Sequence, residues 1–186
     1  MARRAPGLQL ATGNFKQSRA MCGPACLKIV FRFFGRHVSE SHIAKACRTS
    51  SNTGTTGSNL VKAAQRFGFD SELVDRSDFR TLAKWLRKGV PVIVDWMSTI
   101  SSGRGRAPMA CGHYSVVCGL DSDYVVLQDP ATGRRRRVSR SSFLSVWYDF
   151  KLLFPKTADD LIIRRAIIVV PKNFGLGSPR LVRQPT

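Results

Sequence analysis

The sequence predicts an α+β fold in which N-terminal helices pack on a C-terminal antiparallel sheet. Apolar residues recur at three- and four-residue spacing in the first half of the chain, and short β-rich runs follow in the second half. Helices grouped ahead of strands are typical of this class rather than of an alternating parallel-sheet fold. We expect residues 15–171 to form one domain, with a flexible arm over 1–14 and a flexible tail over 172–186.

Helices are expected first along the chain. From Cys22 onward, Leu27, Val30 and Phe34 share one helical face, and Gly35 can end the helix. Ser39 has a side chain suited to capping a short second helix. The expected ranges are 22–34, a short helix after Ser39, 58–67 and 79–88.

Strands dominate the rest of the chain. Two β-rich runs, residues 113–120 and 124–128, predict a hairpin. The long connection from Met97 to Gly112 contains glycine and arginine, and we expect it to be a loop that borders the functional site. The remaining expected elements are a strand over 91–96, a solvated turn at Arg134–Arg137, a helix over 139–147 and a strand over 162–170.

The excess of positive charge indicates which kinds of partner this protein attracts. A formal net charge of +18 attracts acidic peptides, phosphates and nucleic acid, the last without sequence preference. A solvated basic surface with no binding role explains the same charge equally well, and so does a clamp for anions at Arg134–Arg137. The expected partners are a peptide or protein substrate, acidic ones included, with nonspecific attraction to nucleic acid.

The sequence pattern predicts neither a membrane span nor a secretory signal segment. No apolar run approaches the roughly 18 residues of a membrane span, and the first residues do not form a secretory segment. Five cysteines at uneven spacing argue against a disulfide framework. We therefore expect a cytoplasmic protein without a membrane span.

Cys22 stands where the first helix begins. The unpaired N–H groups and the dipole of a helix start favour negative charge, so a thiol at this place ionises more readily, and the thiolate is the nucleophile. Cys26 lies one turn later, lacks this advantage and is expected in the core. A small buried hydrophobe is the alternative interpretation of Cys22.

A thiolate nucleophile needs a base and an orienting group. His113 opens a β-rich run among apolar or small neighbours. If the hairpin reverses around residues 121 and 122, Asp129 returns to about one pair position from His113 and can accept a hydrogen bond from its ring. Gln17 and the backbone N–H of Cys22 can together stabilise an oxyanion. The other two histidines, His37 and His42, are expected at the surface.

Metal binding is an alternative use of some of these side chains. A structural zinc site would take Cys22, Cys26, Cys111 and His113 as ligands. Their spacings do not match the usual pairs of close-set cysteines, so we expect no metal and no cofactor.

Two motifs carry a family resemblance. Gln17, Cys22–Leu27 and Phe33–Gly35 stand in one group, and His113–Val117 followed by Asp129–Pro130 in another. Together they resemble the bacteriocin-processing cysteine peptidases of family thirty-nine, the double-glycine leader peptidases of the papain-like group. The resemblance runs from about Gln17 to about Val170.

The resemblance implies a papain-like fold with Cys22 as nucleophile, His113 as general base and acid, Asp129 as orienter and Gln17 in the oxyanion hole. It implies hydrolysis of a peptide bond through a thioester acyl-enzyme, typically after a Gly-Gly pair, without metal or cofactor. The chain lacks membrane spans and a phosphate-binding glycine-lysine loop, so we expect a stand-alone member without transporter domains. Two alternatives stay open on the same fold: a transamidase, deamidase or isopeptidase, and a non-catalytic peptide- or anion-binding module.

Overall fold

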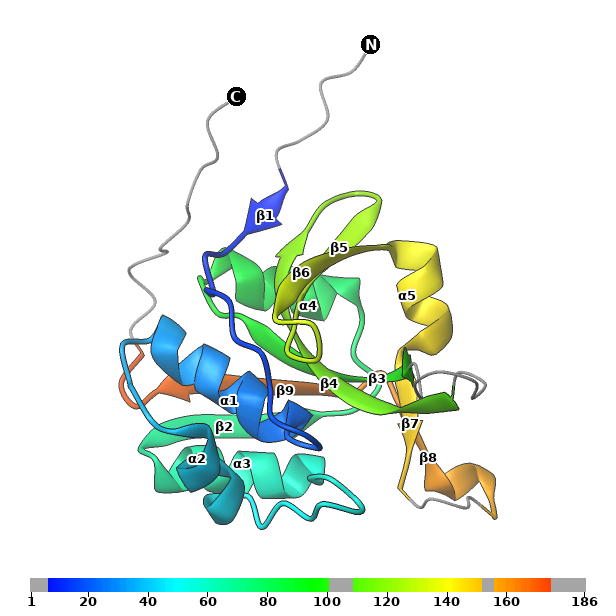
Figure 1. The fold of residues 1–186 in the computed structure, drawn as a ribbon. Coiled ribbons are helices and arrows are strands. Elements are labelled where there is room, and N and C mark those ends of the chain that lie inside the picture. Colours follow the sequence, from blue (N-terminus) through cyan, green and yellow to red (C-terminus); the bar gives the residue numbers. More distant parts are fainter. Residues whose placement is uncertain (1–6, 101–108, 152–155, 175–186) are drawn as a thin grey trace.

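A seven-stranded antiparallel sheet forms the centre of the molecule (Figure 1). The computed structural model describes residues 7–100, 109–151 and 156–174. A separate pair of strands extends beyond this sheet. In sheet order the strands are β2 (Phe69–Val74), β9 (Ala166–Pro171), β3 (Val92–Ile100), β4 (Met109–Leu120), β5 (Tyr124–Asp129) and β6 (Arg134–Ser139), with β1 (Leu8–Gln9) beside β4; the separate pair is β7 (Tyr148–Phe150) and β8 (Leu161–Ile163).

Helices cover both faces of the large sheet. Capping side chains begin most of them, as the sequence predicts: the Ser39 hydroxyl and the Asp78 carboxylate each accept a backbone N–H from the first turn. The predicted α+β class is confirmed. The helices are α1 (Cys22–Phe33), α2 (Glu40–Ala46), α3 (Gly57–Arg66), α4 (Phe79–Arg87), α5 (Arg140–Val146) and the short 3₁₀ helix η1 (Ala158–Asp160).

The core has two halves, one on each face of the sheet. Successive side chains of a strand point to opposite faces, and β3 shows this directly. Ile93 packs with apolar residues of α1, α2 and α3, whereas Val92 and Val94 pack with those of α4 and α5. The sheet is therefore buried on both sides. Among the described residues, no helix is long and apolar enough to cross a bilayer.

The predicted hairpin forms, with one irregularity in its register. β4 and β5 pair antiparallel, with Leu120 opposite Val125 and Val116 opposite Gln128. A bulge between Val117 and Gly119 shifts the register by one residue, and Asp129 follows Gln128, the last residue of β5 that pairs with β4. This hairpin brings Asp129, at the end of β5, beside His113 of β4.

The predicted turn at Arg134–Arg137 is wrong. These four arginines lie in β6, where Gln128 pairs with Arg135 and Leu127 with Arg136. The turn that precedes them contains Gly133, whose φ of +71° favours glycine. The sequence did not predict this strand because arginine has no marked preference for strands. The strand forms because its backbone groups pair with those of β5.

The predicted flexible arm is also wrong for the residues that the structure describes. Leu8 pairs with Leu120 in β4, and Leu10 is 1% exposed in the core. Burial of Leu10 and backbone pairing fix this segment, and residues 1–6 lie outside the described residues. At the other end, the ring of Phe174 packs against Phe34, and the expected tail beyond residue 174 lies outside the description.

Two further expectations need correction, and one strand was missed. β3 continues to Ile100 and β4 begins at Met109, so both ends of the expected loop from Met97 to Gly112 lie in strands, and residues 101–108 lie outside the described residues. The single expected strand over 162–170 is two strands, because Arg164 takes a left-handed φ of +49° between them. β2 was not anticipated at all.

Candidate active site

The first helix begins at Cys22, as the sequence predicts. Met21 is its N-cap and provides no side-chain hydrogen bond, so the first N–H groups of the helix need other partners. The backbone N–H groups of Gly23 and Tyr114 interact with the Cys22 sulfur and favour its negative charge. A side chain at Gly23 would press on Leu60 and Thr55, so this glycine allows α1 and α3 to pack closely at the helix start.

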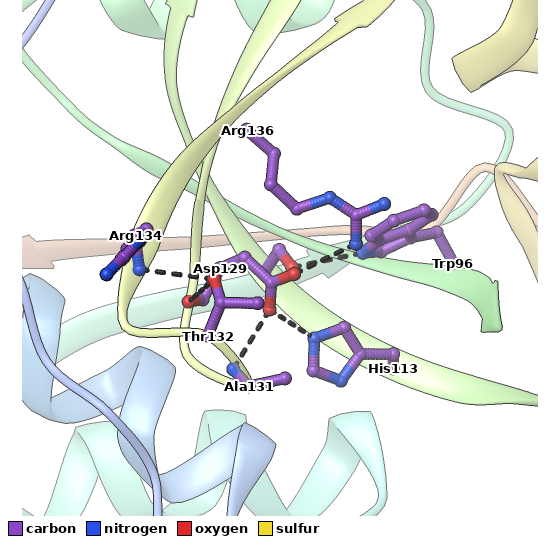
Figure 2. Close-up of polar contacts among 8 residues, drawn as sticks. Trp96, His113, Asp129, Ala131, Thr132, Arg134 and Arg136 are labelled. Carbon is purple, nitrogen blue, oxygen red and sulfur yellow. Dashed lines mark hydrogen bonds and ion pairs between the residues drawn. The ribbon is translucent and has the colours of Figure 1, made fainter. Parts of the chain in front are cut away.

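His113, inside β4, and Asp129, the last residue of β5, form a buried pair (Figure 2). The Nε2 atom of His113 lies 2.8 Å from Oδ1 of Asp129. The same oxygen accepts the backbone N–H of Ala131 at 2.9 Å. His113 also interacts with Cys22, since the charge of each residue shifts the pKa of the other. These side chains come from three separate elements, α1, β4 and β5.

Their charges reinforce one another. Burial on its own would raise the pKa of the Cys22 thiol, but the hydrogen bond and charge of His113 outweigh it and lower that pKa. Burial likewise opposes the charged form of His113, yet its hydrogen bonds to Asp129 and Cys22 raise its pKa to about 9. Against burial, the hydrogen bond from His113 lowers the pKa of Asp129 to about 2. The arrangement therefore favours a thiolate beside an imidazolium.

The other four thiols lie in the opposite electrostatic setting. Burial raises the pKa of Cys26 and Cys118, and raises that of Cys47 to about 12. Burial, together with the charges of Cys22 and Asp149, also raises the pKa of Cys111. Cys26 is fully buried, as expected from its place on the helix.

Iodoacetamide should therefore modify Cys22 at least about tenfold faster than the other four thiols at pH 7, because alkylation follows the thiolate fraction. Peptide mapping by mass spectrometry after a short reaction measures each site. Reaction in denaturant is the control, since all five thiols then have similar pKa values. Equal rates at all five sites of the folded protein would contradict this expectation.

Gln17 lies on the segment that leads into Cys22. Its backbone N–H donates to the carbonyl of Pro130 at 2.9 Å, which ties this segment to the turn after Asp129. The side chain of Ser18 donates to Glu40 at 2.6 Å and anchors the segment on its other side. The Oε1 atom of Gln17 is buried without a hydrogen-bond partner within the described part of the chain. The role of Gln17 stays a prediction.

A second carboxyl pair lies on the other side of β4 and escaped sequence analysis. Asp95 is 1% exposed, and burial together with the nearby charge of Asp149 raises its pKa well above the usual range. Asp149 lies so close to Gly112 that a side chain at this glycine would collide with its carboxylate. Asp95 stands inside an apolar run and Asp149 follows the last predicted helix, so no spacing in the sequence connects them.

Metal ligation finds no support in residues 7–100, 109–151 and 156–174, where no group of three or more His, Cys, Asp and Glu side chains could hold an ion. The four side chains considered as zinc ligands are not arranged as such a group. His37 and His42 are exposed, as expected.

The fold is that of the papain-like cysteine peptidases. The crystal structure of the peptidase domain of Streptococcus ComA, a bi-functional ABC transporter, matches with a TM-score of 0.63 and 25% identity, covering 86% of this chain and 98% of that domain. A double glycine motif protease from an AMS/PCAT transporter, solved in complex with its leader peptide, has the same fold at a TM-score of 0.57 and 19% identity, with coverage of 88% and 97%.

The chain belongs to the Peptidase_C39 like family, whose model matches residues 9–153. An uncharacterized protein of Methanothermobacter marburgensis is 30% identical over 138 residues, which cover 74% of this chain and 84% of that protein. The lactococcin-G-processing and transport protein LagD of Lactococcus lactis is 26% identical over 142 residues, or 76% of this chain. The match spans only 18% of the length of LagD and likewise of ComA.

Proposed function

We propose that this protein is a cysteine peptidase that uses Cys22, His113 and Asp129. One observation carries the proposal: a histidine whose Nε2 lies 2.8 Å from a buried carboxylate interacts with a thiol at a helix start and favours the charged form of that thiol. A nucleophile, a base and an orienting group in hydrogen-bond contact are what acyl transfer requires. The free state of all five cysteines supports a reducing compartment such as the cytoplasm.

The reaction follows from these contacts. The Cys22 thiolate attacks the carbonyl carbon of the substrate, and a C–S bond forms. The negative charge moves to the carbonyl oxygen, which the backbone N–H of Cys22 and the side-chain amide of Gln17 stabilise. His113 gives its proton to the leaving nitrogen as the C–N bond breaks. It then takes a proton from the water that hydrolyses the thioester, which restores the thiolate.

The substrate class follows from the relatives and from charge. LagD is named for processing lactococcin G, and the double glycine motif protease holds a leader peptide. We propose a peptide substrate cleaved after a Gly-Gly pair. With a net charge of +18, acidic peptides should associate faster than basic ones, and added salt should reduce this difference.

A mixed peptide library that includes Gly-Gly sequences tests the activity. Mass spectrometry of the products distinguishes a cleaved peptide from a one-dalton deamidation or a joined product. We expect cleavage by the wild type and none by Cys22→Ala. Deamidated or joined products alone would replace hydrolysis by transfer chemistry, and unchanged peptides would overturn the proposal.

A further inference from the structure

Asp129 has a second partner on the side away from His113. Its Oδ1 atom accepts from His113 and Ala131, and its Oδ2 atom accepts from Nη1 of Arg136 at 2.9 Å (Figure 2). The Asp129 side chain is only 1% exposed, whereas that of Arg136 is 42% exposed. Arg136 is therefore the outer member of a chain of contacts that leads inward to His113.

Arg136 also packs against the ring of Trp96, beside the His113–Asp129 pair. Its guanidinium lies 5.2 Å from the ring centroid of Trp96, and that ring lies 6.0 Å from the ring of His113. Trp96 is fixed in turn, because its Nε1 donates to the hydroxyl of Ser115 at 3.1 Å. Together Arg136 and Trp96 separate the carboxylate from water on the side that the histidine does not cover.

The neighbouring arginine of β6 makes a different contact. Adjacent residues of a strand point to opposite faces, so Arg137 points away from Arg136. It pairs with Asp121 at 3.1 Å and lies over the ring of Tyr124. Arg137 thus has the same side chain and its own carboxylate but no contact with Asp129, which makes it a matched control.

We propose that Arg136 is a positioning residue that holds Asp129 toward His113 and offsets part of the carboxylate charge. This inference rests on the proposed function. An arginine holds a carboxylate with a fixed planar donor geometry, so it restricts rotation of Asp129. Its positive charge also counteracts the stabilisation that Asp129 gives to the imidazolium. His113 can then give up its proton to a leaving group more readily than if Asp129 acted alone.

The other charged groups around His113 are also defined. Cys22 of α1 and Asp129 of β5 contact it directly, and Asp149 of β7 lies against the adjacent Gly112. Asp95 of β3 lies beside Asp149. A substitution at Arg136 leaves all four in place. Arg136 makes its hydrogen bond to Asp129, and its other contact near His113 is with the uncharged ring of Trp96.

The test follows His113 itself rather than product formation. NMR titration of protein labelled with ¹³C-histidine gives the pKa of each of the three histidines, and His113→Gln assigns the signal. In Arg136→Met we expect the pKa of His113 to rise by about half a unit, since a positive charge is removed from behind its carboxylate partner and solvent screens part of the effect. Arg136→Lys keeps the charge and should leave this pKa near that of the wild type, as should the control Arg137→Met.

Peptide turnover separates positioning from charge. We expect kcat to fall about tenfold in both Arg136 variants, because lysine cannot reproduce the planar contact, with no change in Arg137→Met. An unchanged His113 titration in Arg136→Met, or a fall in kcat shared by Arg137→Met, would overturn the role of Arg136. Wild-type protein that cleaves nothing while the titration shift is present would instead refute the peptidase proposal and leave the coupling of Arg136 to His113 intact.

Discussion

Peptide cleavage should disappear when Cys22 is replaced by alanine. The sulfur forms the covalent intermediate, so its removal leaves only binding and the oxyanion donors, and we expect turnover to fall by about 10⁴-fold or more. His113→Ala should cost about as much, because the thiolate and the imidazolium form together and act as a unit. Turnover is measured with the best peptide from the library, and folding by thermal unfolding followed by circular dichroism.

The Cys22→Ala variant should keep its fold. The change removes a single sulfur, and Gly23 and Leu60 still pack α1 against α3. Cys111→Ala is a matched control, since this thiol lies near Cys22 but has a raised pKa and no proposed role. A Cys22→Ala protein that retains more than a tenth of the wild-type turnover while folding normally would exclude Cys22 as the nucleophile.

Asp129→Ala should cause the next largest loss. The variant leaves His113 without its hydrogen-bond partner and Arg136 without its carboxylate. We expect turnover to fall by about 10²- to 10⁴-fold, since the ring loses its orientation. Breaking a fully buried pair costs 3–5 kcal/mol, and because Arg136 is partly exposed we expect a loss of about 2 kcal/mol in unfolding free energy.

The pH dependence of this loss has a defined sign. The pKa of His113 is raised from 6.5 to about 9, so its contribution to stability is complete below about pH 6.5 and is lost as the pH rises through about 9. The pKa of Asp129 is lowered from 3.8 to about 2, so its contribution is present above about pH 4 and is lost as the pH falls through about 2. Asp129→Ala should therefore be most destabilising between pH 4 and 6.5.

Urea unfolding across this pH range measures the difference. Arg137→Met is the control, because the Arg137 side chain is 57% exposed and its ion pair with Asp121 should contribute less than about 1 kcal/mol. A difference between Asp129→Ala and the wild type that stays constant from pH 4 to pH 10 would contradict the coupling of Asp129 to His113.

Local sequence patterns predicted the helices of the first half of the chain and one hairpin of the sheet. Apolar spacing and capping residues located the N-terminal helices, and turn residues located the β4–β5 hairpin. Cys22 was placed at a helix start from a proline and a glycine in its neighbourhood. These features depend on residues close together in sequence, and such signals survive without knowledge of the tertiary fold.

Contacts between segments that are distant in the sequence were harder to predict. The approach of Asp129 to His113 was estimated from hairpin reversal, but the bulge at Val117 and Gly119 changed the register. Arg136 drew attention only as part of a charge run, since a row of arginines predicts solvent exposure. Its contact with Asp129 depends on pairing between β5 and β6, and four successive arginines show no period-two alternation that would indicate a strand.

The separation of the site residues along the chain has a consequence for synthesis. Cys22 leaves the ribosome well before His113 and Tyr114, whose ring and backbone N–H lower its pKa in the folded protein. Until β4 is made and pairs with its neighbours, the nascent polypeptide carries an ordinary thiol at this position. A reactive thiolate therefore forms in the translating cell only after β4 has been made and has paired with its neighbours.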